Sequence, residues 1–405
     1  MRDVPTQTIS HQTEPHANGP EGREPPLVSA VSCPDYHLDR VREALRAVLA
    51  PWGGMGRFVR PGQRVLVKPN LLSARPPEDA VTTHPALVQA VVEAVQEAGG
   101  IPFIGDSPGA AGARVSVGKV YRVSGMEQVS QATGAPLVYD AEPVEWTYPA
   151  GRWLRRVVVW RAAAEADLII NLPKLKTHNL VGLTGAVKNC FGLVPGSHKT
   201  QLHMRWPRPD QFSEMLLDLY LRAKPVLHVM DAVLAMEGDG PSAGDPRPVG
   251  ALLASTDGVA CDVAMAALVG HPPHRVTTTA AAIRRGLTTG RPEDLRWVGA
   301  PLADLQVQKF RPSVVWITNS PAALWLLGLA GRLTAARPEM TEACVGCGLC
   351  AENCPADAIT IRDGRARVDR GLCIHCFCCH ELCPYQAVEV QRPRLGEWIV
   401  RMFSR

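Results

Sequence analysis

Eight of the twelve cysteines in this sequence form two copies of one motif, Cys-x2-Cys-x2-Cys-x3-Cys-Pro, within the last 65 residues. The first copy consists of Cys344, Cys347, Cys350, Cys354 and Pro355, and the second of Cys373, Cys376, Cys379, Cys383 and Pro384. This spacing is typical of two 4Fe-4S clusters, in which the fourth cysteine of each copy binds the cluster of the other. We therefore predict one cluster held by Cys344, Cys347, Cys350 and Cys383, and a second held by Cys373, Cys376, Cys379 and Cys354.

The two motifs belong to an internal repeat, because the segments beginning at Cys344 and Cys373 align over 18 residues. Each copy predicts a cluster loop, a short helical turn and a strand, and Asp363-Gly364 predicts a hairpin. The result is a small α+β domain over residues 341–392 that resembles the bacterial two-cluster ferredoxins. So short a domain cannot bury a large core, so cluster ligation must supply much of its stability.

Zinc and disulfide bonds are the alternative uses of these cysteines. Zinc sites usually take two separated Cys-x2-Cys pairs rather than three cysteines in a row and a fourth before proline. Disulfides would require an export signal, which we do not find. Cys378 is an extra cysteine inside the second motif; it is either a packed thiol or an alternative ligand, and we favour the packed thiol.

The length and composition indicate a soluble globular protein of two or three domains, with 405 residues and 46% hydrophobic residues. A net charge of +4 is small for this length, and we predict no nucleic-acid binding. Residues 1–25 are polar without an apolar core, which predicts a disordered lead-in rather than a secretory signal. A cytoplasmic location follows.

Two further segments bear on membranes. The apolar stretch 313–333 is interrupted by Asn319-Ser320-Pro321, so neither half reaches the roughly 20 residues that cross a bilayer. We predict no transmembrane span, and expect residues 311–340 to form a strand and a linker helix. The tail at 393–405 mixes apolar residues with arginines, and we expect a helix that docks on the protein itself rather than on a membrane surface.

Strands and helices alternate through residues 26–310. The predicted strands cover residues 26–33, 64–70, 101–109, 137–140, 156–160, 166–179, 224–233 and 251–262. Helical patterns separate several of them, including residues 39–50 and the segment that begins at Pro85. This order predicts an α/β domain whose mostly parallel sheet carries helices on both faces. Sites in such folds gather beyond the carboxyl ends of the strands.

Lysine and asparagine are scarce in the chain and concentrate at those strand ends. Only eight of the 43 basic residues are lysines, yet four of them lie between residues 174 and 199. Lysine is a compact amine that can lose its proton or form a covalent bond, unlike arginine. We therefore predict a pocket for a ligand that carries a phosphate or a carboxylate. The residues predicted to bind this ligand are Lys68, Asn70, Lys174, Lys176 and Asn189.

The richest part of this region is the glycine-rich segment 171–199. Lys188 and His178 are our candidates for a catalytic base or a covalent anchor. Gly185 precedes a short helical pattern, which predicts an anion site at a helix N-terminus. The alternative is an exposed basic loop with structural glycines. A second candidate loop contains Asp231 and Glu237, which we also predict to bind the ligand, either through a cation or as a base. The alternative is an acidic turn.

Several motifs together resemble a known family. The segments VKPN, THP, GDS, NLPKLKTH…GLTGAVKNCFG and MDA…EGDGP are similar to the bacterial and archaeal domain of unknown function 362. The resemblance covers residues 26–310 and extends to the ferredoxin-type C-terminal domain, but it implies no reaction. The glycine-rich segment is also similar to that of the nickel-pincer lactate racemases. That resemblance implies a covalent anchor at Lys188 and an acid–base histidine at His178.

Three functions follow as hypotheses. The first is a redox protein whose two clusters relay electrons to or from a small anionic substrate, either directly or through a further cofactor. The second is an electron-transfer adaptor or maturation partner, which docks a redox partner protein and has no catalysis of its own. The third is an isomerase of the nickel-pincer type.

Overall fold

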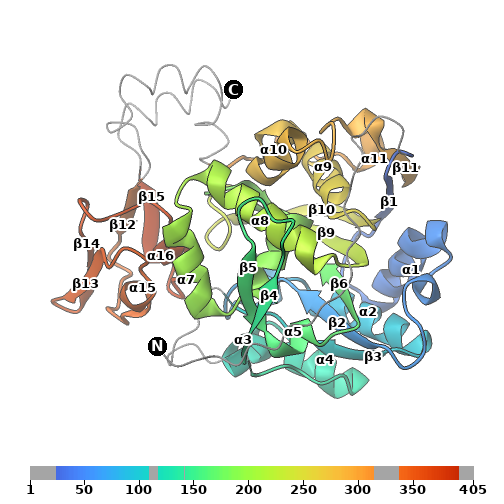
Figure 1. Cartoon of the computed structure of the whole chain (residues 1–405), viewed down its shortest axis with the longest axis horizontal. Coiled ribbons are helices and arrows are strands. Elements are labelled where there is room, and N and C mark those ends of the chain that lie inside the picture. The colour runs from blue at the N-terminus through green and yellow to red at the C-terminus, as the bar shows by residue number, and fades with distance from the viewer. Residues whose placement is uncertain (1–23, 109–116, 141, 314–336, 392–405) are drawn as a thin grey trace.

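A computed structural model describes residues 24–108, 117–140, 142–313 and 337–391 (Figure 1). Most of the expected lead-in, most of the expected linker and the C-terminal tail lie outside these residues. Among the described helices, none has the length and apolar character needed to cross a bilayer.

The larger part of the chain is built on one nine-stranded sheet with the order β11-β1-β10-β9-β6-β2-β3, in which β7 also pairs with β9, and β8 pairs with β7. Its strands are β1 (Leu27–Ser32), β2 (Arg64–Pro69), β3 (Ile101–Ile104), β6 (Leu168–Leu172), β7 (Lys174–His178), β8 (Gly182–Thr184), β9 (Leu227–Glu237), β10 (Asp245–Ser255) and β11 (Arg296–Gly299). The pairs among β3, β2, β6 and β9 are parallel, whereas β10 is antiparallel to both of its neighbours. The predicted, mostly parallel α/β sheet is therefore confirmed.

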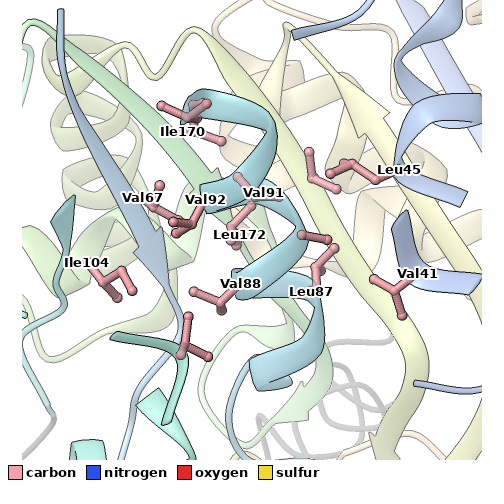
Figure 2. Close-up of a cluster of buried hydrophobic side chains, with 14 of the residues drawn as sticks. Val41, Leu45, Val67, Leu87, Val88, Val91, Val92, Ile104, Ile170 and Leu172 are labelled. Carbon is pink, nitrogen blue, oxygen red and sulfur yellow. The ribbon is translucent and has the colours of Figure 1, made fainter. Parts of the chain in front are cut away.

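Helices cover both faces of this sheet. Successive residues of its central strands therefore pack into two different cores, one on each face. Val65 and Val67 of β2 pack in the core beneath α1 (Leu38–Leu49) and α2 (Pro85–Glu97), as Figure 2 shows for Val67. Leu66 packs in the opposite core. That side is covered by α8 (Pro209–Ala223), α9 (Gly258–Leu268) and α10 (Thr277–Arg284). A strand buried on both faces has no polar face, and this explains why Val65, Leu66 and Val67 of β2 are all apolar.

Local signals set the ends of α2. Pro85 occupies its first turn, and the side chain of His84 accepts a hydrogen bond from the amide of Ala86. Gly99 follows the helix with φ +80°, a conformation that favours glycine. This helix connects β2 to β3, which are parallel, so the polar ends of both strands stand at the same edge of the sheet.

The structure differs from the sequence-based strands in several places. The expected strand at 101–109 ends with β3 at Ile104. The expected strand at 251–262 ends with β10 at Ser255, and α9 begins at Gly258. Residues 137–140 form no strand; Leu137 makes only an isolated bridge with Ile104. Residues 156–160 form β5 (Arg156–Trp160), which pairs with β4 (Pro143–Thr147) in a separate hairpin instead of the main sheet. The expected strand at 166–179 divides into β6 and β7 at Pro173, which has no amide N–H for a sheet ladder.

The small C-terminal domain consists of short antiparallel pairs and two short helices. β12 (Arg337–Met340) pairs with β15 (Val388–Gln391), and β13 (Ile359–Arg362) pairs with β14 (Arg365–Val368). Asp363 and Gly364 both have positive φ in the β13–β14 turn, as a two-residue hairpin loop requires. The helices are α15 (Leu349–Glu352) and α16 (Cys378–Leu382), one from each repeat.

The small domain packs against the α/β domain through α16. Figure 1 shows α16 beside α7 (Gly196–Arg205), with the β13–β14 hairpin on the far side of the small domain. Ser242 Oγ donates a hydrogen bond of 3.1 Å to the carbonyl oxygen of His380 across this contact.

Candidate functional site

The small domain contains two thiol-lined cavities. The thiols of Cys344, Cys347, Cys350 and Cys383 line one, and those of Cys354, Cys373, Cys376 and Cys379 line the other. Each cavity therefore takes three cysteines from one motif and the fourth from the other. These are the two sets that the spacing predicts as cluster ligands.

The donor sets fit 4Fe-4S clusters. Four thiols surround a cavity in each case, which suits a cluster with one iron per thiol. Among the described residues, no three His, Cys, Asp or Glu side chains converge as a single metal ion would require. Backbone amides donate to three of the sulfurs: Ala366 to Cys344, Ala358 to Cys354 and Ala387 to Cys383, at 3.2 to 3.3 Å. Such donors stabilise thiolate charge and tune cluster potentials.

A third cavity lies between the two domains. From the α/β domain it is lined by Asn70, Leu72, Asp106, Ser107, Thr184, Lys188, Asn189, Phe191, Gly192, Lys199, Thr200 and His203. From the small domain it is lined by Asn353, Cys378, Glu381 and Leu382. We call it the interdomain cavity. About 60 Å³ of it is open to the centres of water molecules, which is room for a ligand of a few non-hydrogen atoms.

Strand ends build the α/β side of the interdomain cavity. Asn70 directly follows β2, Asp106 lies just beyond β3, and Thr184 ends β8. Lys188 and Asn189 come from α6 (Ala186–Asn189), which begins directly after β8. This is the edge at which ligands bind in open α/β sheets.

Lys188 is the cavity lysine whose ammonium is least constrained. Its Nζ lies 5.0 Å from the ring centre of Phe191 and 6.0 Å from that of Phe212. Burial lowers the pKa of Lys188, and the facing carboxylate of Glu381 partly opposes this shift. Within the described part of the chain, no hydrogen bond holds this amine. It is therefore able to turn towards a ligand.

His178 and Glu381 join the two domains. The amide of Leu180 donates to His178 Nδ1 at 3.0 Å, so the proton of the neutral ring sits on Nε2. That nitrogen lies 3.2 Å from Glu381 Oε1. Burial lowers the pKa of His178, while the pKa of Glu381 lies below its ordinary value because His178 and Lys188 outweigh the effect of burial. His178 therefore stands behind Glu381, and only Glu381 lines the cavity.

Lys68 is not among the described residues that line the interdomain cavity, but it is paired with Asp106, which does line it. Its Nζ lies 2.7 Å from Asp106 Oδ1 in a fully buried ion pair, and Asp106 Oδ2 accepts from the amide of Leu71 at 2.7 Å. Gly192 passes so close that an added Cβ would lie 1.8 Å from Asp106 Oδ1 and 2.6 Å from Lys68 Nζ. The absence of a side chain at this position is what lets the ion pair form.

Replacing Gly192 with alanine should therefore lower the free energy of unfolding by about 2 kcal/mol, since the new methyl group overlaps the ion pair. Gly56→Ala is the matched control, because Gly56 has no heavy atom within 4 Å of a built Cβ. Anaerobic guanidinium unfolding of the two variants measures the difference. Equal stabilities would show that the Lys68–Asp106 pair does not depend on this close approach.

Lys199 is tied to the backbone of the neighbouring loop. Its Nζ donates to the carbonyl oxygens of Ser107 and Pro108. Burial lowers the pKa of Lys199 to about 7 from 10.5, so the amine is neutral in the folded protein at alkaline pH.

This shift predicts a pH dependence of stability. Between pH 7 and 10 the unfolded chain keeps a proton on Lys199 that the folded chain lacks, so folding gains with rising pH. The unfolding free energy of the natural protein minus that of Lys199→Met should rise by up to about 1.4 kcal/mol per pH unit. Denaturant unfolding of both proteins at pH 7, 8 and 9 measures it, and cysteine ionisation cancels in the comparison. A difference that stays constant with pH would contradict the low pKa.

Four of the predicted ligand-binding residues lie outside the lining of the interdomain cavity and are engaged by other groups of the protein. Lys174 Nζ lies 2.9 Å from Asp231 Oδ2 in a fully buried pair that also bonds Tyr36. Lys176 Nζ donates to the carbonyl oxygen of Val81 at 2.7 Å. None of these three predicted residues is among the described residues that line the interdomain cavity.

Glu237, the fourth, also lies outside that lining. It accepts hydrogen bonds from the amide and Nε of Arg311, at 3.0 and 2.8 Å. The expected anion site after Gly185 is likewise occupied by the protein, because the carboxylate of Asp262 accepts from the amides of Ala186 and Val187.

Sequence reasoning passed over several cavity residues. Asp106 and Ser107 belong to the GDS segment at the end of the predicted strand 101–109, whereas Thr184 and His203 carried no signal that set them apart. Glu381 has a different explanation: it lies inside the cysteine-rich repeat, where each residue is first interpreted in terms of the clusters.

The fold and the two thiol sets define an iron–sulfur protein with an attached α/β domain. Residues 343–387 match the 4Fe-4S dicluster domain, and residues 65–267 match the Domain of unknown function (DUF362). The chain belongs to the DUF362 family.

A thylakoid-associated protein of Synechocystis sp., sll1697, is 39% identical over 267 residues, which cover 64% of this chain and 79% of that protein. Among solved structures, the lactate racemase apoprotein from Thermoanaerobacterium thermosaccharolyticum aligns with a TM-score of 0.37 and 14% identity. A Thermotoga maritima protein aligns with a TM-score of 0.31 and 11% identity. The chain spans 56% and 59% of these two structures, and they span 60% and 61% of this chain.

Proposed function

We propose that this protein is a redox protein in which two 4Fe-4S clusters relay electrons to or from a small anionic ligand in the interdomain cavity. One observation carries the proposal: α16 of the small domain forms a wall of the cavity that also contains Lys188. Cys378 of that wall stands between Cys376 and Cys379, two predicted ligands of one cluster. The cluster loop and the cavity wall are therefore one peptide segment.

The arrangement also supports an order for the two clusters. Asn353 and Cys378 line the interdomain cavity, and each adjoins a cysteine of the set that contains Cys354 and Cys376. Val345 and Tyr385 line the other thiol cavity and are more than half exposed. We propose that electrons enter or leave through this outer cluster and reach the cavity through the inner one.

The chain's own residues would bind the ligand and hold a proton beside it. Lys188 would attract the anion and, because burial lowers its pKa, would release or take up a proton beside it. Glu381, whose pKa is lowered, would remain a carboxylate next to His178. The clusters, when bound, supply single electrons, and two of them suffice for a two-electron reduction. A ligand that accepts electrons directly or a further bound cofactor completes the chemistry.

We also propose a cytoplasmic location. Cys33, Cys190 and Cys261 are buried free thiols, which is usual in reducing compartments. The name of the Synechocystis relative describes an association of that relative with thylakoids, and we do not extend this location to the present protein.

The test uses the full-length protein, reconstituted anaerobically and analysed for iron, sulfide, nickel and bound small molecules. The clusters are reduced with dithionite, and small carboxylates and oxyanions are then added while cluster absorbance is followed. We expect iron and sulfide without nickel, and at least one anion that reoxidises the clusters. Reoxidation only by another redox protein would favour the adaptor, and stoichiometric nickel would favour the isomerase.

A further inference from the structure

Three asparagine side chains form a hydrogen-bonded chain that ends at the interdomain cavity. The carbonyl oxygen of Ala186 can only accept, so the atom of Asn171 that lies 3.0 Å from it is Nδ2. The same Nδ2 lies 3.0 Å from His228 Nδ1, and burial lowers the pKa of His228 to about 3, leaving a neutral ring that accepts. Asn189 Nδ2 then donates to Asn171 Oδ1 at 2.8 Å, and Asn70 Nδ2 donates to Asn189 Oδ1 at 2.9 Å.

This chain leaves Asn70 in one orientation. Its Nδ2 is committed to Asn189, so its Oδ1 is the atom without a partner among the described residues. Reversing the amide would place two oxygens against each other and would propagate to the fixed carbonyl of Ala186. A buried acceptor without a donor is costly, and Asn70 lines the cavity. The ligand must therefore bring a hydrogen-bond donor.

A second observation points to the same cavity. Thr184 is 2% exposed, lines the cavity, and its Oγ1 has no hydrogen-bond partner among the described residues. A hydroxyl can donate to an anionic oxygen, as can the ammonium of Lys188. The cavity thus offers two groups, Thr184 Oγ1 and Lys188 Nζ, to an anionic oxygen. Its acceptors without a hydrogen-bond partner among the described residues, Asn70 Oδ1 and Glu381 Oε1, are left for a donor.

We infer that the ligand is a small anion that carries its own hydroxyl group, either a protonated oxyanion or a hydroxycarboxylate. The inference rests on the proposed binding of a small anion in the interdomain cavity. It adds that Asn70 Oδ1 accepts the ligand's hydroxyl proton and so selects against anions of the same size that lack one.

The experiment compares matched anions by anaerobic calorimetry on the oxidised, cluster-loaded protein. Hydrogen phosphate is compared with sulfate, and glycolate with acetate, so that the two arms separate oxyanions from carboxylates. In at least one pair we expect the anion with the hydroxyl to bind about tenfold more tightly. Equal affinities within both pairs, or no binding of any of the four anions, would overturn the inference.

Two variants assign the selection to Asn70. Asn70→Leu, or Asn70→Ala if the first does not fold, should reduce the tenfold ratio to about one. Thr184→Val should weaken both members of the pair while keeping their ratio. If only Thr184→Val removes the ratio, Asn70 is not the acceptor. Because this is equilibrium binding, a preserved ratio without any ligand-driven cluster oxidation would reject the electron relay and leave this inference standing.

Discussion

Cys354→Ala and Cys376→Ala should remove the same cluster, although these two cysteines belong to different motifs. Both thiols line one cavity, so the loss of either leaves that cluster with three ligands. The iron content should fall from about eight to about four atoms per chain, because each cluster contains four irons. Iron analysis and electron paramagnetic resonance of the reduced variants measure the loss, and the surviving signal should be identical in the two proteins.

Cys383→Ala and Cys347→Ala provide the reciprocal pair, since both thiols line the other cavity. They should retain the signal that the first pair loses. Cys378→Ser is the control within the second motif and should keep both clusters, because its thiol lines the interdomain cavity instead of either cluster cavity. If Cys354→Ala instead loses the same signal as Cys347→Ala, each motif holds its own cluster and the exchanged arrangement is wrong.

Lys188→Met should slow the oxidation of the reduced clusters by the cavity ligand by about 100-fold. The substitution keeps the length and apolar contacts of the side chain but removes the cation that faces the ligand. Loss of one such electrostatic contact in an enclosed site typically costs a factor of a hundred or more. Stopped-flow absorbance of dithionite-reduced protein, mixed anaerobically with the ligand, measures the rate.

Lys188→Arg separates a role of the amine from a role of charge alone. Arginine keeps the positive charge but cannot lose its proton, and its larger fork does not fit where the compact ammonium sits over Phe191. We expect it to be as slow as Lys188→Met. Lys119→Met, at an exposed lysine far along the chain from the cavity segment, should react at the natural rate. Natural rates in all three variants would assign the α/β domain a docking role.

The fold class was readable from the sequence because its signals are local. Val65, Leu66 and Val67 follow one another in β2, as a strand with helices on both faces requires. Pro85 and Gly99 mark the ends of α2 by their own backbone preferences. The strand at 137–140 was predicted wrongly because an apolar run of that length does not reveal whether a neighbouring strand is within reach, and only Leu137 finds one.

By itself, the sequence determined what the cysteine repeat implies, since spacing alone dictates which thiols can surround a common centre. It also showed that lysines and asparagines concentrate beyond the strand ends. Only the tertiary structure decided which of these face a cavity: Lys188 does, whereas Lys174 is paired with Asp231 in the interior. It alone placed Glu381 of the small domain against His178. Such contacts depend on how separately folded segments pack against each other, and no local pattern in the chain encodes that geometry.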